Sequence, residues 1–158
     1  INYNYCKTNP KKFFGYSDSV CGLTASDVEN GYRASSPTDD AGFIAPTAAL
    51  SSFSYTPVES MQALKFYYYV LGDKIWKDYG FVDAFSLSRA WFAESFLAID
   101  QGPIIVMIEN YRTGYYGTYL TVVQKLNQGC DPWVFPLHTY NIDYEIPESF
   151  IAGYTGLY

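Results

Sequence analysis

The chain has 158 residues, of which 49% are hydrophobic and 16% charged, a composition typical of a folded globular protein. Its formal net charge of -6 argues against partners that attract basic proteins, so we expect no binding to nucleic acid or to an anionic membrane surface. Aromatic residues make up 20% of the chain, and 17 of them are tyrosines. Tyrosine and tryptophan rings suit the apolar faces and hydroxyl edges of sugars, but they suit a packed core equally well.

The sequence contains no run of about 18 apolar residues, so we expect no membrane insertion. Residues 1–12 lack the apolar stretch of a signal peptide, and the chain begins with Ile1, which indicates a processed chain or a piece of a longer one. Cys6 and Cys21 could pair in an oxidising compartment or stay free thiols, because a third cysteine, Cys130, makes the number odd. His138 is the only histidine and no Cys-x-x-Cys pair occurs, so we expect neither a metal site nor a cofactor.

The segment from residue 22 to 50, GLTASDVENGYRASSPTDDAGFIAPTAAL, has no strand alternation and no helical stripe before its last residues. We therefore predict a long loop that leads into a short helix near Pro46. The loop holds four carboxylates, an arginine and two aromatic residues, which is more than a solvated loop requires. Loops of this length in a compact domain are usually functional.

The following segment, TPVESMQALKFYYYVLGDKIW, predicts a helix. Thr56 suits the N-cap, Pro57 the first helical position and Glu59 the third, which together predict a capping box, and Gly72 predicts the end. One helical face collects apolar side chains, namely Val58, Met61, Leu64, Tyr68 and Leu71.

A short irregular stretch should then precede a second helix in DQGPIIVMIENYRTG. Pro103 predicts its start and Gly114 its end. Its middle, IIVMI, is apolar on all sides, which predicts a buried helix. After residue 115 the pattern fits helix or strand, and three prolines from residue 130 on indicate loops and short extended pieces.

These motifs, in this order, resemble a known family. GLTASD, GYRASSPTDDAGFIAPTAALSSFSYTP, LGDKIW, YGFVDAFS and AIDQGPIIVMIENYRTG together look like the glycoamylase-like domain of bacterial glycoside hydrolases, which includes glucoamylase-like proteins and endo-β-1,2-glucanases. A related module occurs in cyclic β-1,2-glucan synthases. The resemblance spans roughly residues 15–114 and depends on several motifs at plausible spacing rather than on any single one.

The resemblance implies an all-α fold, an (α/α)6 toroid of inner and outer helices. Such a barrel needs several hundred residues, so this chain would be a C-terminal segment, and the rest of the barrel would come from a missing N-terminal part. Residues 1–114 would belong to this domain. Residues 115–158 depart from the family pattern after ENYRTG and would be a poorly recognised continuation of the same domain.

Glycoside hydrolysis uses two carboxyl groups, one that protonates the leaving oxygen and one that activates water or attacks the sugar. With the resemblance, Asp27 and Asp100 become the predicted catalytic residues. Taken alone, Asp27 would be an ordinary turn residue and Asp100 an N-cap. The predicted sugar-binding residues are Tyr32, Arg33, Asp39, Asp40, Asp83, Trp91 and Gln101.

The resemblance therefore implies a glycoside hydrolase that cleaves a glucan, β-1,2-glucan first, with an oligo- or polysaccharide as its partner. Three alternatives stay open: hydrolysis of an α-glucan, a non-catalytic glucan-binding module, and a transglycosylase domain of cyclic β-1,2-glucan synthesis. The family context also implies a periplasmic or secreted bacterial protein.

Overall fold

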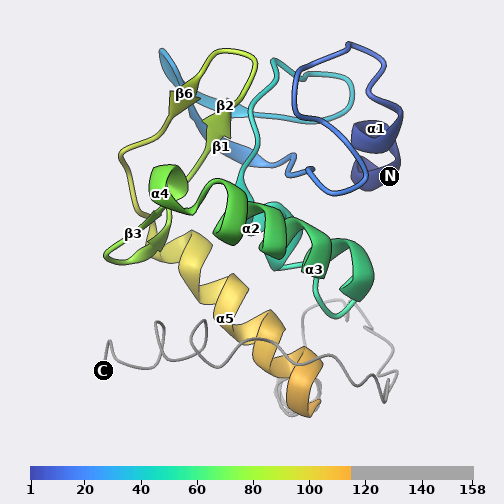
Figure 1. The fold of residues 1–158 in the computed structure, drawn as a ribbon, viewed down its shortest axis with the longest axis vertical. Helices are drawn as coiled ribbons and strands as arrows, with labels where there is room; N and C mark the ends of the chain where they lie inside the picture. Colours follow the sequence, from blue (N-terminus) through green and yellow to red (C-terminus); the bar gives the residue numbers. More distant parts are fainter. Residues whose placement is uncertain (115–158) are drawn as a thin grey trace, which may run out of the picture.

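The computed structural model describes residues 1–114; the predictions for residues 115–158 and His138 lie outside these residues. Three antiparallel hairpins, not one sheet, accompany the helices in this part of the chain (Figure 1). The helical elements are α1 (Asn2–Thr8), α2 (Pro46–Leu50), α3 (Pro57–Lys65), the π-helical turn η1 (Phe66–Val70), α4 (Gly72–Ile75) and α5 (Ala98–Thr113). The strands are β1 (Ala25–Val28), β2 (Gly31–Ala34), β3 (Trp76–Lys77), β4 (Gly80–Phe81), β5 (Phe85–Ser86) and β6 (Trp91–Phe92).

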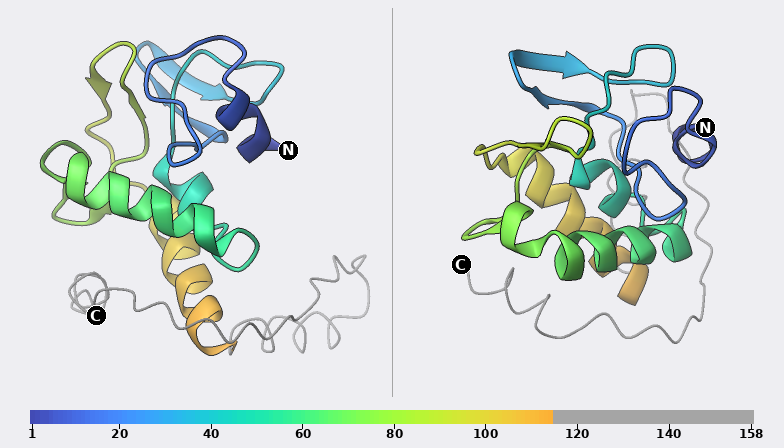
Figure 2. Two further views of the ribbon diagram at one scale, coloured as in Figure 1. Left: turned by 45° about the vertical axis from the view of Figure 1, so that its right-hand side comes forward. Right: turned by 45° about the horizontal axis from the view of Figure 1, so that its top comes forward.

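Helices and hairpins occupy different sides of the molecule. Figures 1 and 2 show α2, α3 and α5 together on one side, with α1 and the hairpin β1–β2 on the other. Helix α2 packs against both α3 and α5. Although α2 is only five residues long, it thus connects α3 and α5 to the side of the molecule that holds the hairpin β1–β2.

The expectation of an all-α chain is wrong, because the described residues contain six strands. The predicted long loop contains the hairpin β1–β2, whose ladder runs from Ala25↔Ala34 to Val28↔Gly31. The turn consists of Glu29 and Asn30, and Gly31, which opens β2, takes a φ of 135° that favours glycine. The strands β3 to β6 have two residues each, too few for alternation to be visible in the sequence.

The first predicted helix is confirmed from Pro57 onward, but its ends differ from the prediction. Thr56 is the N-cap residue without a side-chain capping bond; its hydroxyl donates to the Ser52 carbonyl instead, at 3.3 Å. Gly72 does not end the helical region, because it opens α4 after the π-helical turn. That turn adds a residue to one helical repeat, so Tyr67 becomes fully buried while Tyr68 is only partly so.

The second predicted helix begins earlier than expected. Helix α5 starts at Ala98, and Pro103 lies inside it. The predicted end is confirmed, since Gly114 caps the helix with a φ of 66° and its N–H donates to the Asn110 carbonyl at 2.8 Å. The prediction of burial on all sides is wrong: Ile104 and Ile108 are buried, and the apolar residues between them are half-buried.

The core is rich in aromatic rings that come from several elements. Tyr67 is fully buried, and its ring meets Phe81 and Phe85 edge-on at 6.1 and 5.6 Å between centroids. Its hydroxyl donates to the Cys21 carbonyl at 2.7 Å, so the buried polar tip has a partner. Part of the high aromatic content therefore serves packing rather than binding.

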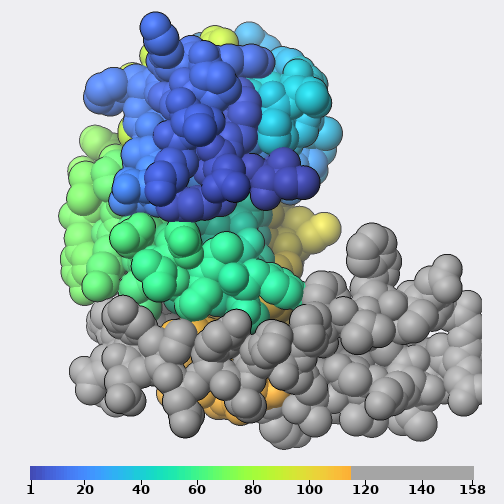
Figure 3. Space-filling view, turned by 90° about the vertical axis from the view of Figure 1, so that its right-hand side faces the viewer, coloured from blue at the N-terminus to red at the C-terminus, as the bar shows by residue number. Residues whose placement is uncertain are grey.

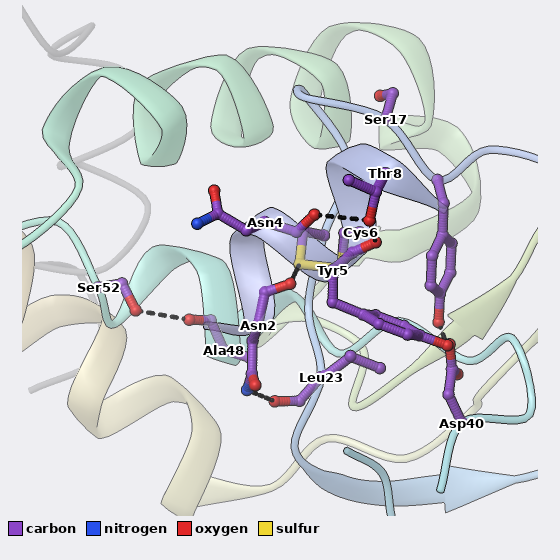
Figure 4. Close-up of a disulfide and its surroundings, with 12 residues drawn as sticks. Asn2, Asn4, Tyr5, Cys6, Thr8, Ser17, Leu23, Asp40, Ala48 and Ser52 are labelled. Carbon is purple, nitrogen blue, oxygen red and sulfur yellow. Dashed lines mark hydrogen bonds between the residues drawn. A yellow bond between two sulfur atoms is a disulfide. The ribbon is translucent and has the colours of Figure 1, made fainter. Parts of the chain in front are cut away.

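A disulfide fastens the N-terminal segment to the chain before β1. Cys6 and Cys21 pair, with 5.5 Å between their Cα atoms, which decides between the two possibilities that the sequence left open. Figure 4 shows the bond beside Asn2, whose side-chain amide donates to the Leu23 carbonyl at 3.2 Å. In Figure 3 the N-terminal segment forms a continuous layer next to the green helices α3 and α4.

Candidate acidic site

Three aspartates that are far apart in the sequence come together in the structure. Asp27 lies in β1, Asp83 follows β4, and Asp100 lies in the first turn of α5. The backbone N–H of Asp27 donates to Oδ2 of Asp83 at 2.5 Å. The carboxyl groups of Asp83 and Asp100 are neighbours, and each shifts the pKa of the other. The two predicted catalytic residues are thus linked through Asp83, which the sequence had placed among the sugar-binding residues.

The three carboxyl groups differ in their exposure to solvent. Asp83 has 1% of its surface exposed and Asp100 7%, whereas Asp27 is half-buried. Within residues 1–114 no donor group reaches Oδ1 of Asp83 or Oδ2 of Asp100. Buried carboxylate oxygens without donors are costly, which favours a proton on the pair.

The pKa of Asp100 is raised to about 7, first by burial and then by the neighbouring Asp83 and the negative charge of Asp27. A carboxyl group in this environment still carries its proton near neutral pH, as a general acid requires. Asp100 is the third residue after the N-cap Leu97, so it is not the capping residue that its position in the sequence suggested.

The pKa of Asp83 is raised as well, first by burial and also by the negative charge of Asp27, while the N–H of Asp27 and the neighbouring Asp100 oppose the rise. The two carboxyl groups therefore titrate as a coupled pair. With almost no exposed surface, Asp83 is placed to hold its two neighbours rather than to contact a sugar directly.

Tyr32 lies next to this cluster through the strand ladder. Asp27 pairs with Tyr32 across β1 and β2, and directly opposed residues in an antiparallel pair share one face of the sheet. Tyr32 is 65% exposed, so its ring has a free face beside the Asp27 carboxylate. The predicted role as a sugar platform is compatible with this position.

Arg33 and Asp39 form an ion pair on the surface of the same region. Their side chains are 41% and 57% exposed, so water screens the pair, and it contributes little to stability. The hydrogen bond between the two side chains raises the pKa of Arg33 and lowers the pKa of Asp39. Both groups stay charged at neutral pH and accessible to a polar ligand.

Asp40 points away from solvent, unlike its neighbour Asp39. It is 5% exposed, and its Oδ1 accepts hydrogen bonds from the Tyr16 hydroxyl at 2.9 Å and from the Gly42 N–H at 2.8 Å. Burial and the adjacent Asp40 carboxylate raise the pKa of Tyr16, which keeps that hydroxyl a donor. The predicted sugar ligand Asp40 is therefore engaged in anchoring its loop to the N-terminal segment (Figure 4).

Trp91 and Gln101 are both half-buried. The Trp91 ring packs edge-on against Phe43 at 5.3 Å, and the Gln101 side-chain amide donates to the Phe81 carbonyl at 2.7 Å. Trp91 keeps part of its ring accessible, whereas Gln101 ties the start of α5 to β4.

Ser95 is a site residue that the sequence analysis missed. Its hydroxyl donates to Oδ2 of Asp27 at 2.5 Å, and its carbonyl accepts the N–H of Asp83 at 3.1 Å. Ser95 lies in the connection between β6 and α5, where no motif marks it. Only the folding of that connection onto β1 brings its hydroxyl to the cluster.

A cavity of about 420 Å³ lies elsewhere, between the N-terminal segment and the helices α2 and α3. Its lining includes Asn2, Leu23 and Ser60, and none of the three clustered aspartates. Within residues 1–114, no group of three metal-binding side chains has the geometry to hold a metal ion, and no helix is long and apolar enough to cross a membrane.

Comparison with known proteins agrees with the motifs. The Glycoamylase family, described as "Putative glucoamylase", matches residues 1–120, and the chain belongs to this family. An exo-β-1,2-glucooligosaccharide sophorohydrolase (non-reducing end) of Parabacteroides distasonis is 48% identical over 115 residues, which are 72% of this chain and 16% of that protein.

Two solved structures give the same result. The endo-β-1,2-glucanase of Chitinophaga pinensis, solved with sophorotriose and glucose, matches with a TM-score of 0.70 and 49% identity over 73% of this chain and 28% of its own. The β-1,2-glucanase of Parabacteroides distasonis matches with a TM-score of 0.71 and 47% identity over 73% of this chain and 17% of its own. The chain thus spans less than a third of these relatives.

Proposed function

We propose that the chain is part of a glycoside hydrolase that cleaves β-1,2-glucan with carboxyl groups as acid and base. The observation that carries the proposal is the cluster of half-buried Asp27 with buried Asp83 and Asp100, in which the pKa of Asp100 is raised to about 7. The relatives named as β-1,2-glucan hydrolases, at close to half identity, supply the substrate class.

The different environments of the carboxyl groups suggest their roles. Asp100 keeps its proton near neutral pH and donates it to the leaving glycosidic oxygen. Asp27 is more exposed, and its carboxylate is oriented by Ser95, so it acts as the partner that faces water or the sugar. Asp83 fixes both through its Oδ2 and its contact with Asp100.

The exposed groups around Asp27 form the sugar-binding part of the proposal. The Tyr32 ring stacks on a glucose unit, and Arg33 and Asp39 bind hydroxyl groups at the edge. Trp91 supplies a second, partly accessible ring. These roles depend on the remainder of the protein for the opposite wall of the site.

Incubation of the purified natural protein with β-1,2-, β-1,3- and α-1,4-glucans tests the proposal through the release of reducing ends. We expect release from β-1,2-glucan, abolished in Asp27→Asn and Asp100→Asn and retained in the control Asp73→Asn, whose side chain is 75% exposed in α4. Binding without release from any glucan would indicate a binding module, and a cyclic product would indicate a transglycosylase. Either result would refute the proposal that the chain is part of a hydrolase.

We also propose a periplasmic or secreted location. The disulfide between Cys6 and Cys21 supports it, because such bonds persist in oxidising compartments. Fractionation of the source cells, followed by peptide mapping without reduction, should recover the paired cysteines outside the cytoplasm. Recovery of both as free thiols with cytoplasmic markers would overturn this proposal.

A further inference from the structure

Asp27, Asp83 and Ser95 form a closed ring of three hydrogen bonds. The N–H of Asp27 donates to the Asp83 carboxylate at 2.5 Å, and the N–H of Asp83 donates to the Ser95 carbonyl at 3.1 Å. The Ser95 hydroxyl then donates back to the Asp27 carboxylate at 2.5 Å. Each residue is both donor and acceptor, so displacement of one changes the position of the other two.

The ring joins three segments that are separate in the chain, so only noncovalent contacts hold them in place relative to one another. Asp27 comes from the hairpin β1–β2, Asp83 from the chain after β4, and Ser95 from the connection that leads into α5. A further bond beside the ring, from the Ala93 N–H to the Ala84 carbonyl at 2.9 Å, holds the Ser95 connection against the chain after Asp83. Two backbone hydrogen bonds thus hold the Ser95 connection against the Asp83 segment, whereas the side chain of Asp27 is held by the Ser95 hydroxyl.

We propose that Ser95 is a positioning residue that sets the orientation of the Asp27 carboxylate for reaction. In the described residues, the Ser95 hydroxyl is the only side-chain donor bonded to that carboxylate. This bond restricts the orientation of the Asp27 carboxylate, and catalysis depends steeply on such orientation. The inference rests on the proposed hydrolase function but does not follow from it.

The decisive comparison is between Ser95→Ala, which removes the hydroxyl, and Ser95→Thr, which keeps it. We expect kcat on β-1,2-glucan to fall by about tenfold or more in Ser95→Ala with KM little changed, since the lost interaction matters in the transition state. Ser95→Thr should recover most of kcat. Ser95→Cys, similar in size to serine but a weak donor, should behave like Ser95→Ala.

Ser52→Ala is the matched control. Ser52 is also half-buried, and its hydroxyl makes one bond, to the Ala48 carbonyl at 2.8 Å (Figure 4). Loss of that bond should lower stability slightly without changing kcat. A similar fall of kcat in Ser52→Ala would mean that general loosening of the fold explains the effect, and would overturn the inference.

A second measurement does not depend on activity. The amide proton of Asp27, bonded to a carboxylate, should resonate far downfield in the NMR spectrum and should move upfield in Ser95→Ala as the ring opens. An unmoved signal, or unchanged kcat in Ser95→Ala, would overturn the role of Ser95. If the wild-type protein released no sugar from any glucan, the hydrolase proposal would fail, and the amide signal alone would decide on the ring.

Discussion

Replacing Asp100 by asparagine should reduce activity and, at neutral pH, increase stability. The substitution keeps the shape of the side chain and removes the acidic proton. An amide N–H at this position can donate to the neighbouring Asp83 carboxylate without carrying a charge of its own. Catalytic residues are often placed at a cost in stability, so opposite effects on the two properties distinguish such a residue from a structural one.

The size of the stability effect follows from the pKa of Asp100. It is raised from 3.8 to about 7, so the folded state binds this proton more tightly than the unfolded state. The stabilisation from proton binding is complete below pH 3.8 and is lost as the pH rises through about 7. One pKa unit corresponds to about 1.4 kcal/mol, which sets an upper limit of about 4 kcal/mol at higher pH. Water and the adjustable neighbours reduce this cost, and we expect about 1–2 kcal/mol.

Urea unfolding of the wild-type protein and Asp100→Asn at pH 4 and pH 8 measures this effect. From pH 4 to pH 8, the free energy of unfolding of the variant should rise by about 1–2 kcal/mol relative to that of the wild type. Its kcat on β-1,2-glucan should fall about 100-fold or more. A stability difference that is the same at both pH values would refute the reasoning about burial. Full activity in the variant would refute the role as general acid.

Three further predictions concern groups around the site. Asp40→Ala should destabilise the protein by about 2–3 kcal/mol in urea unfolding, because the Gly42 N–H loses its acceptor and the Tyr16 hydroxyl keeps only the Phe43 carbonyl; unchanged stability would contradict the anchoring role. Tyr32→Ala should weaken glucan binding about 10-fold in calorimetry, whereas Tyr32→Phe, which keeps the ring, should not; equal losses would exclude stacking. Reduction of the Cys6–Cys21 disulfide, which spans 15 residues, should cost about 3 kcal/mol, and an unchanged unfolding midpoint would mean that the N-terminal segment stays in place without it.

Local signals predicted several helical features correctly. Proline at the first helical position marked the starts of α2 and α3, and glycine with a positive φ marked the end of α5. The start of α5 was mispredicted because Leu97 offers no capping side chain and Pro103 is a stronger signal inside the helix. The hairpin β1–β2 was missed although Asn30 and Gly31 stand where the chain reverses, because its strands are short and polar.

In the candidate site, too, some residues could be selected from the sequence and others could not. Asp27 and Asp100 were selected from the sequence through family motifs, but no local pattern could show that Asp83 connects them. Asp39 and Asp40 are adjacent in sequence and have opposite surroundings, since one lies in solvent and the other is bonded to Tyr16. Ser95 could not be found at all, because a single hydroxyl acquires its role only from what it contacts.

The sequence by itself thus determined the family, the chemical class of the site residues and most of the longer helices. These depend on motifs and on interactions between residues near one another in the chain. Only the tertiary structure decided which carboxyl groups meet, which of them are buried and in which direction their pKa values shift. A pKa reflects desolvation and charges across space, and Asp27, Asp83 and Asp100 influence one another only once β1, the chain after β4 and α5 have packed together.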